Sequence, residues 1–197
     1  VTEAEIDTLV AEYERIYEFA DDCKKGTEKH QYVRDSAAQE IGLRRFLQEK
    51  KAKAFTTSFD ELEGMKQLMG FASQRLMAEG YGFGAEGDWK TAALCRTMWV
   101  MASGLPGGSS FLEDYTLNFA GEKSSILQAH MLEINPEIAA KKPRVEVHYL
   151  GIGDSGTCTR LVFQAHEGEG VAATIVDMGN RFRMIVNEVE VIKPKAL

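Results

Sequence analysis

Two polar residues stand out because they interrupt apolar alternation near the middle of the chain. Glu113 alternates with Phe111 and Tyr115, and His130 occupies the same kind of position beside Leu132. Alternate residues of a strand share one face. A buried carboxylate on such a face needs a cation, a metal ion or hydrogen bonds to offset its desolvation. These two residues are therefore candidate members of a polar site.

A second carboxylate, Glu86, lies in a glycine-rich stretch, Gly80–Gly87, directly before Asp88. Asp88 is placed to cap the helix that follows, so the stretch brings a carboxylate close to a helix start. Together with Glu113 and His130, Glu86 would supply two oxygen ligands and one imidazole. Such a set suits manganese, iron, cobalt or zinc. Spacing in the sequence does not show that the three residues meet.

Each of these residues also has a simpler interpretation. Glu113 can lie in solvent at a sheet edge, and His130 can be a hydrogen-bonded core residue. The pattern Gly82-x-Gly84-x-x-Gly87 matches the dinucleotide-binding fingerprint, but we expect a helix rather than a strand ahead of it. The acidic residue that normally follows about 20 positions later is also missing. Nucleotide binding is therefore the weaker hypothesis for this stretch.

The first half of the chain predicts helices. Thr2 and Glu5 have capping-box spacing ahead of an apolar stripe that continues to Ala20. Further helices are expected at about 32–53, from Ser58 with Glu61 as capping partner, and at 89–103, with a short strand at 54–57 before the third. The glycine-rich stretch is expected to be a loop.

After Pro106 the apolar period changes to two, which is typical of strands. Strands are expected at 111–119, 126–134, 145–150, 160–165, 171–178 and 181–192, with a hairpin turn at Gly179 and Asn180. The predicted fold class is thus α/β to α+β. A helical or α/β N-terminal part precedes an antiparallel β-sheet or barrel-like part.

Composition excludes several classes of protein. The 197 residues carry a net charge of −7, with 30 acidic and 23 basic residues, which argues against an electrostatic binder of nucleic acid or membranes. No apolar run is long enough to span a membrane. The three cysteines lie far apart and favour a reducing, cytoplasmic setting.

Several long motifs resemble one enzyme family. The run GYGFGAEGDWKTAAL, followed in order by SGLPGGSSFLEDYTLNF, LQAHMLEINPEIA and YLGIG, is similar to the L-arabinose isomerases. Upstream, AFTTSFDELEGMKQL and IDTLVAEYE fit the same family. The resemblance implies that residues 1–104 are the end of a central α/β domain. It implies that 105–197 are the start of a C-terminal β-rich domain.

The resemblance also implies roles for single residues. Glu86 and Glu113 match the family's paired acid/base carboxylates and two of its metal ligands, His130 matches a third ligand, and Phe59 matches an aromatic residue beside the sugar. The implied reaction converts L-arabinose to L-ribulose through a cis-enediol. One carboxylate moves the carbon-bound proton and the other handles the hydroxyl proton. The implied cofactor is Mn(II).

Family members are longer than 197 residues, so the resemblance implies a catalytic core fragment. A fourth metal ligand, a histidine, would come from a later segment, and further site residues from a neighbouring subunit of a trimer or hexamer. Two alternatives remain open. The chain on its own can be a non-catalytic module, or the parent can be a related ketol isomerase that acts on L-fucose or D-galactose.

Overall fold

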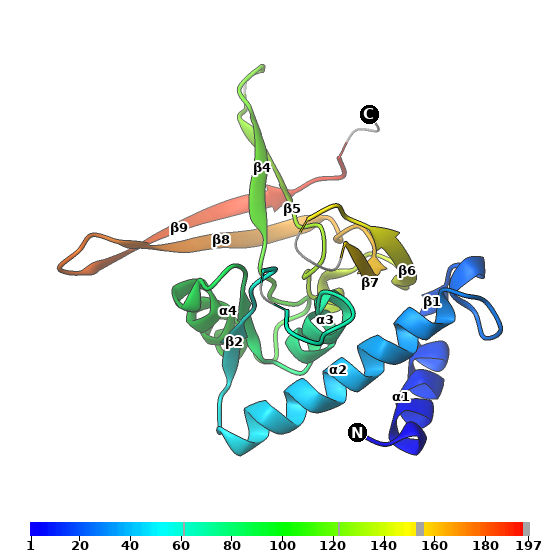
Figure 1. Ribbon diagram of the computed structural model, residues 1–197. Helices are drawn as coiled ribbons and strands as arrows, with labels where there is room; N and C mark the ends of the chain where they lie inside the picture. Colours follow the sequence, from blue (N-terminus) through cyan, green and yellow to red (C-terminus); the bar gives the residue numbers. More distant parts are fainter. Residues whose placement is uncertain (61, 122, 153–155, 195–197) are drawn as a thin grey trace.

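The computed structural model describes residues 1–60, 62–121, 123–152 and 156–194 (Figure 1). Four α-helices and nine strands are distributed along this part of the chain, with two short 3-10 helices. The helices are α1 (Glu3–Ile16), α2 (His30–Glu49), α3 (Gly70–Ala78) and α4 (Trp89–Met101), and the 3-10 turns are η1 (Asp21–Cys23) and η2 (Pro136–Ile138). The strands are β1 (Glu18–Phe19), β2 (Ala54–Thr56), β3 (Gly82–Gly84), β4 (Glu113–Asn118), β5 (Ser125–Ala129), β6 (Arg144–Tyr149), β7 (Thr157–Val162), β8 (Gly168–Asp177) and β9 (Phe182–Val191).

The start of α1 confirms the sequence prediction. The Thr2 side chain accepts a hydrogen bond from the Glu5 backbone N–H, and the Glu5 carboxylate accepts one from the Thr2 backbone N–H. This capping box satisfies two backbone donors that the first turn would otherwise leave free. The helix ends at Ile16 and Tyr17 is its C-cap, so the apolar stripe continues four residues beyond the helix.

Two helix boundaries differ from the predictions. Helix α2 covers His30–Glu49 and so begins and ends earlier than expected. Helix α3 begins at Gly70, so the prediction of a helix from Ser58 was wrong. Glu61, its expected capping partner, lies outside the described residues. Most of the segment between β2 and α3 is irregular, and residues 57–59 of it line the candidate site.

The strands form four separate small sheets in the described part of the chain. Strands β1, β6 and β7 make one sheet in that order, with β1–β6 parallel and β6–β7 antiparallel. Strands β2 and β3 pair in parallel, whereas β4–β5 and β8–β9 are antiparallel hairpins. The predicted class, helices followed by antiparallel strands, is confirmed. The strands after residue 105 are divided among several sheets because each hairpin pairs locally.

The main core joins the two halves of the chain. Phe71 of α3 is fully buried and contacts the rings of Tyr13 and Tyr17, with centroid separations of 4.5 and 5.7 Å. Val145 of β6 and Leu161 of β7 belong to the same buried cluster. Helices α1–α3 therefore pack on the three-stranded sheet, as Figure 1 shows.

A charged group is buried inside this core. Glu40 of α2 has no exposed surface and accepts a hydrogen bond from Tyr13 Oη at 2.6 Å. Arg75 Nε lies 3.3 Å from the same carboxylate, and Arg44 forms a second ion pair with it. Burial and the negative charge of Glu40 hold the pKa of Tyr13 well above its ordinary value. The network gives every buried charge a partner, as burial of ions requires.

Two glutamines of the α3 region bind the free edge of β7. Gln67 Oε1 accepts the backbone N–H of Thr159 at 2.8 Å, and Gln74 Oε1 accepts that of Leu161 at 2.7 Å. Both amides are fully buried. Because β7 is the last strand of its sheet, these side chains satisfy backbone donors that would otherwise be buried without partners.

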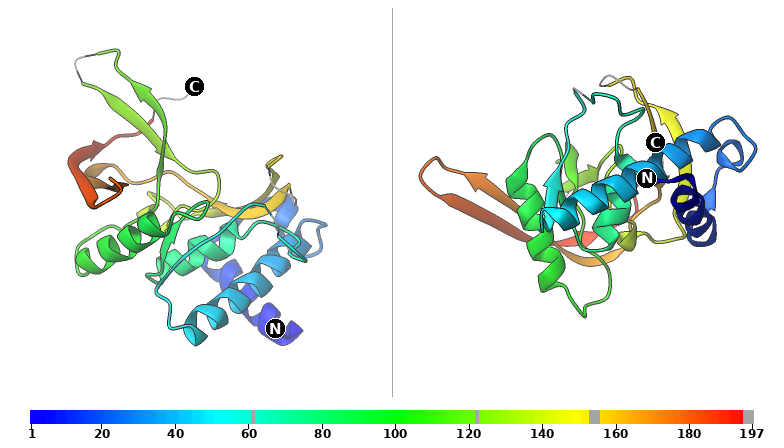
Figure 2. Two further views of the ribbon diagram at one scale, coloured as in Figure 1. Left: turned by 60° about the vertical axis from the view of Figure 1, so that its left-hand side comes forward. Right: turned by 60° about the horizontal axis from the view of Figure 1, so that its bottom comes forward.

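The two hairpins project from the body in different directions (Figures 1 and 2). In the β4–β5 hairpin, Tyr115, Leu117 and Phe119 are 45–73% exposed. Of the two interpretations that the sequence left open for this strand, the solvent-exposed one therefore holds beyond Phe111. In β8–β9, Phe182 and Met184 are also more than half exposed. None of the helices in the described ranges has the length and apolar character needed to cross a bilayer.

Candidate active site

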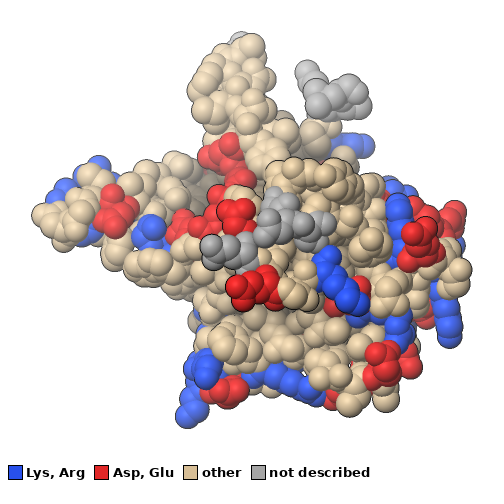
Figure 3. Space-filling view, viewed as in Figure 1, with Lys and Arg blue, Asp and Glu red and all other residues tan. Residues whose placement is uncertain are grey.

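One pocket brings together all four residues that the sequence singled out. Phe59, Glu86, Glu113 and His130 line it. The remaining lining residues come from the same neighbourhood: Thr57, Ser58, Leu68, Met69, Ala85, Met131, Leu132, Glu133 and Ile152. Acidic side chains gather at the foot of β4 on the face shown in Figure 3. The pocket therefore has a carboxylate-rich wall.

The parallel pair β2–β3 positions Glu86. Thr56 pairs with Gly84, so both strands end at the same edge, and Glu86 follows two residues later. Glu86 has a backbone φ of 55°, in the left-handed region, and the next N–H, of Gly87, donates to Thr56 Oγ1 at 2.8 Å. The side chain is exposed at the pocket. Carboxyl ends of parallel strands are common binding edges in α/β proteins.

The glycines of the fingerprint pattern allow α4 to pack closely on β3. A Cβ on Gly82 would collide with the Ala92 carbonyl oxygen, and one on Gly84 with that of Asp88. Helix α3 does precede this stretch, as expected, but Gly82–Gly84 form strand β3, so the expectation that the whole stretch is a loop was wrong. The glycine spacing is thus explained by strand–helix packing.

Helix α4 begins at a cap that lies close to Glu86. The Asp88 side chain accepts hydrogen bonds from the Thr91 backbone N–H at 3.0 Å and from Thr91 Oγ1 at 2.7 Å. Burial alone would raise the pKa of Asp88, but these bonds and Lys90 outweigh it and hold the pKa below its usual value. The cap is therefore ionised and fixes the turn that carries Glu86.

The β4–β5 hairpin places Glu113 beside His130. Glu113 pairs with Ala129, the residue before His130, and a bulge follows between Asp114 and Thr116. The Glu113 Oε2 atom lies 3.8 Å from His130 Nε2. The Glu113 side chain is 39% exposed and that of His130 is 8% exposed. Glu113 therefore lies at the edge of the pocket and His130 inside it.

An aromatic chain supports the imidazole. The ring of Phe111 packs edge-on against His130, with centroids 5.1 Å apart. Phe111 in turn contacts Phe83 of β3, and Phe83 contacts Phe55 of β2. These contacts connect the hairpin that carries Glu113 and His130 with the strand pair that leads to Glu86.

Glu133 is a site residue that the sequence reasoning missed. It is 5% exposed, and its Oε2 atom lies 2.9 Å from His130 Nδ1. It falls three residues after His130, in a stretch where we expected a regular strand to continue to Ile134. Strand β5 ends at Ala129, and the chain then turns so that both side chains meet. An acidic residue three positions from a histidine was the available signal, although outside a helix it is weak.

Phe59 forms part of the apolar wall. It is partly buried and packs against Leu62, Leu68, Leu132 and Cys158. Burial raises the pKa of the Cys158 thiol to about 12, with nearby Glu133 adding to the rise and Arg160 opposing it. The pocket thus has one apolar side and one side lined by carboxylates and imidazole.

The donor set fits a borderline divalent ion by its chemistry, since two carboxylates and one imidazole suit Mn(II). Glu113 and His130 already face each other. In the described ranges no three acidic, histidine or cysteine side chains are grouped closely enough to hold an ion. Glu86 therefore lies in the same pocket without completing a ligand cluster.

Two family models together cover nearly the whole chain. The model for the L-arabinose isomerase central domain matches residues 1–104, and the model for the L-arabinose isomerase C-terminal domain matches residues 108–197. The chain belongs to the L-arabinose isomerase family. In this family's terms, Phe59 and Glu86 lie in the central-domain match, and Glu113 and His130 in the C-terminal match. The pocket is built by both.

Curated L-arabinose isomerases are similar along almost the entire chain. The protein of that name from Bacteroides thetaiotaomicron is 59% identical over 204 aligned positions, covering 100% of this chain and 40% of the relative. Those from Arthrobacter sp. and Geobacillus kaustophilus are 53% and 52% identical, covering 96% and 99% of this chain and 37% and 39% of the relatives. The chain thus spans about two-fifths of the length of these L-arabinose isomerases.

Proposed function

We propose that this chain forms part of the active site of an enzyme that converts L-arabinose to L-ribulose. The observation that carries the proposal is the convergence of Glu86, Glu113, His130 and Phe59 on one pocket built by both family matches. Aldose–ketose isomerisation needs two proton-handling groups close to one sugar. Three carboxylates line the pocket, and the two that reach solvent are Glu86 and Glu113.

In the proposed mechanism, one of Glu86 and Glu113 removes the proton from C2 of the aldose and returns it to C1. The other moves the proton between the two hydroxyl oxygens, and a cis-enediol lies between substrate and product. General acid–base groups of this kind contribute about 10²- to 10⁴-fold in rate. Phe59 presents an apolar surface to the sugar carbons and excludes water from that side.

We propose Mn(II) as the cofactor, with Glu86, Glu113 and His130 as ligands. When bound, the ion would stabilise negative charge on the substrate oxygens. His130 supports this assignment because its Nε2 atom faces Glu113 from a buried position. We further propose that residues outside this chain, from the rest of the protein and from a neighbouring copy in a trimer or hexamer, complete the site in the cytoplasm.

The test uses the full-length protein that contains this chain. Glu86→Gln and Glu113→Gln should each lower kcat for L-ribulose formation by about 10²-fold or more, and EDTA should abolish turnover until Mn(II) is restored. Glu137→Gln is the matched control because Glu137 is exposed and does not line the pocket. Unchanged activity in either site variant contradicts the proposed roles. L-fucose and D-galactose in the same assay test the related ketol isomerases.

A second candidate is that the 197-residue chain alone is a non-catalytic folded module. Two observations favour it. The described residues hold no group of three acidic, histidine or cysteine side chains close enough to bind an ion, and the chain spans only 40% of its relative from Bacteroides thetaiotaomicron. Calorimetric titration of the isolated chain with MnCl2 separates the two. Tight binding that is lost in His130→Gln contradicts the inert module.

A further inference from the structure

Glu86 has a backbone conformation that its residue type disfavours. Its φ is 55° and that of Gly87 is 83°, and the Asp88 N–H donates to the Ala85 carbonyl oxygen at 2.9 Å. Two consecutive positive φ angles inside such a hydrogen-bonded turn identify type I′. The central positions of this turn favour Asn, Asp or Gly, and a left-handed residue other than glycine is strained. The strain therefore falls on one of the two carboxylates that we propose to move protons.

Packing does not hold the middle of this turn. A Cβ built on Gly87 would meet no atom within 4 Å beyond its chain neighbours, and the turn borders a cavity of about 480 Å³ that Thr56, Glu86 and Gly87 help to line. The ends of the turn are fixed, in contrast, because Ala85 belongs to a buried hydrophobic cluster and Asp88 caps α4. Hydrogen bonds must therefore hold the two central residues.

The hydroxyl group of Thr56 determines the handedness of the turn. The Gly87 N–H, which belongs to the central peptide, donates to Thr56 Oγ1 at 2.8 Å. In a right-handed type I turn, the mirror image of type I′, this N–H would lie on the other side of the turn and point away from Thr56. Strand pairing places Thr56 opposite Gly84, two residues before Glu86. The hydrogen bond therefore favours the left-handed turn and offsets part of its strain.

We propose that Thr56 is a positioning residue, whose hydroxyl oxygen accepts the Gly87 N–H and thereby holds Glu86 in the left-handed conformation that directs its carboxylate into the pocket. The backbone angles of a residue set the direction of its Cα–Cβ bond, so a right-handed turn between the same ends would direct the carboxylate elsewhere. The consequence for catalysis rests on the proposed function, whereas the turn and its hydrogen bond do not. The two are therefore tested separately.

The first measurement follows the turn itself, in the full-length protein that contains this chain and without metal. Thr56→Val removes the acceptor at nearly constant volume, and Thr56→Ser keeps it. Hydrogen–deuterium exchange, measured by mass spectrometry on overlapping peptides that isolate the Gly87 amide, should become about 2- to 10-fold faster in Thr56→Val. It should stay at the wild-type rate in Thr56→Ser. Thr8→Val is the matched control, because the Thr8 hydroxyl is exposed and bonds within α1.

The strain at Glu86 has its own readout. Glycine adopts positive φ without strain and alanine does not, so Glu86→Gly should unfold about 1–2 °C above Glu86→Ala. Differential scanning calorimetry of the two full-length variants measures the shift. Equal unfolding temperatures, or a higher one for Glu86→Ala, contradict a strained left-handed residue at this position.

The second measurement is kcat for L-ribulose formation in the presence of MnCl2. A misplacement of about 1 Å in a catalytic group can cost about 10²-fold in rate, so Thr56→Val should lower kcat by up to about that factor, with a smaller change in KM. Thr56→Ser should restore most of the loss. If Thr56 acts through Glu86, adding Thr56→Val to Glu86→Gln should lower kcat little further, because effects of residues that act as a unit are not additive. Thr56→Ala removes the same acceptor and replaces Thr56→Val if that variant does not fold.

The outcomes separate the proposal from the function on which it rests. Wild-type exchange at Gly87 in Thr56→Val overturns the proposal, and so does an equal additional loss of kcat in the Glu86→Gln background. Unchanged kcat in Thr56→Val overturns it as well if Glu86→Gln is inactive. Faster exchange at Gly87, with kcat unchanged in both Thr56→Val and Glu86→Gln, supports the hydrogen bond that holds the turn and contradicts only the proposed role of Glu86 in the reaction.

Discussion

The body and the two hairpins use apolar side chains in opposite ways. In the body, Phe71 and Val145 are fully buried in a core shared by helices and sheet. In the hairpins β4–β5 and β8–β9, residues with the same strand-like alternation, such as Leu117 and Met184, are more than half exposed. Alternating apolar and polar residues thus indicate a strand. Whether its apolar face is buried depends on a helix or sheet packing against that face. Isolated two-stranded hairpins are marginally stable, so the two regions should differ in stability.

The largest expected difference is in cysteine reactivity within the body. Burial raises the pKa of Cys158 to about 12, from an ordinary value of 9.0. At pH 8 this rise in pKa makes the thiolate fraction about 1000-fold smaller in the folded chain than in an unfolded one. The thiolate is the form that reacts. Ellman's reagent should therefore react with Cys158 at least about 1000-fold more slowly in the native chain than in urea.

The same shift gives a sign for the pH dependence of stability. A thiol whose folded pKa is raised favours folding below the unfolded pKa and loses this preference as the solution becomes more alkaline. The free energy of unfolding should fall as the pH rises from about 9 toward 12. Peptide mapping after brief alkylation identifies the cysteine that reacts. If Cys158 were labelled as fast in the native chain as in urea, the body would open as readily as a hairpin.

The next effect concerns the buried charge in the body. Glu40→Ala leaves Arg75 without its buried carboxylate and should reduce the free energy of unfolding by about 3–5 kcal/mol. Urea unfolding followed by circular dichroism measures the loss. Glu49→Ala is the control, because Glu49 forms an exposed ion pair with Lys50. A loss below about 1 kcal/mol would mean that the buried network is not a source of the body's stability.

Close packing of α4 on β3 predicts a smaller effect. Gly84→Ala places a methyl group against the Asp88 carbonyl and should cost about 1–3 kcal/mol. Gly42→Ala, in the interior of α2 with open space around the added carbon, should instead stabilise by about 0.5–1 kcal/mol. Thermal unfolding of both variants provides the comparison. Equal effects would contradict the role of Gly84 in strand–helix packing.

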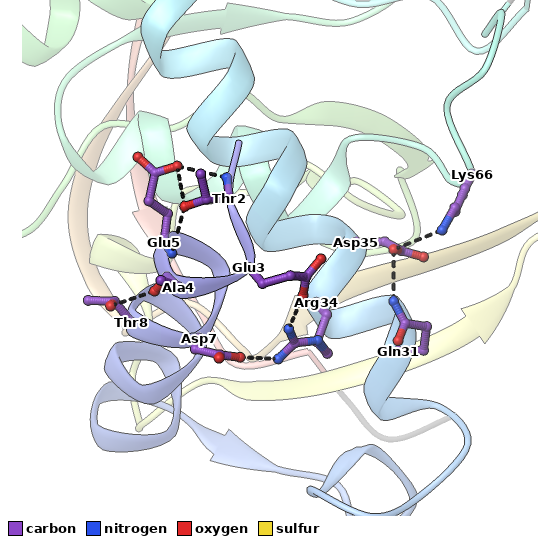
Figure 4. A network of polar contacts seen from close by, with 10 residues as sticks. All are labelled: Thr2, Glu3, Ala4, Glu5, Asp7, Thr8, Gln31, Arg34, Asp35 and Lys66. Carbon is purple, nitrogen blue, oxygen red and sulfur yellow. Dashed lines mark hydrogen bonds and ion pairs between the residues drawn. The ribbon is translucent and has the colours of Figure 1, made fainter.

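The smallest effects are expected at the surface of the body and in the hairpin. Arg34 joins α2 to Glu3 and Asp7 of α1 (Figure 4), but both carboxylates are exposed, so Arg34→Ala should cost no more than about 1 kcal/mol. Met184→Thr in β9 should change stability by less than about 0.5 kcal/mol. Hydrogen exchange should be faster in β8–β9 than in β6–β7. Slower exchange in the hairpin would reverse the ranking of the two regions.

Local signals in the sequence were sufficient for elements whose causes are local. The capping box of Thr2 and Glu5 and the cap by Asp88 were confirmed because both ends of each interaction lie within one turn. Strand β3 was missed because its glycines do not favour strands, and its pairing with β2 comes from a segment 28 positions away. The helix predicted from Ser58 failed for a similar reason, since residues 57–59 line the pocket and do not form a periodic helix.

The candidate site was predicted in its members but not in its geometry. Glu86, Glu113, His130 and Phe59 do line one pocket, and their roles stay predictions. Glu113 is at the pocket edge because a hairpin register, not a buried sheet face, sets its position. Glu133 could not be found from periodicity, because the chain leaves the strand directly after Ala129 and the partner of His130 is determined by that turn.

The two glutamines on β7 have a consequence for how the chain can be rearranged. Gln67 and Gln74 engage N–H groups two residues apart, at Thr159 and Leu161. If β7 slipped by one residue, neither N–H would face its glutamine. The two buried side-chain amides would then lack hydrogen-bond partners. The edge is also closed to strand exchange with another molecule. The segment that carries Gln67 and Gln74 thus fixes the register of β7, which lies far along the chain. A circularly permuted or shuffled chain that changes one of these two segments must preserve their alignment.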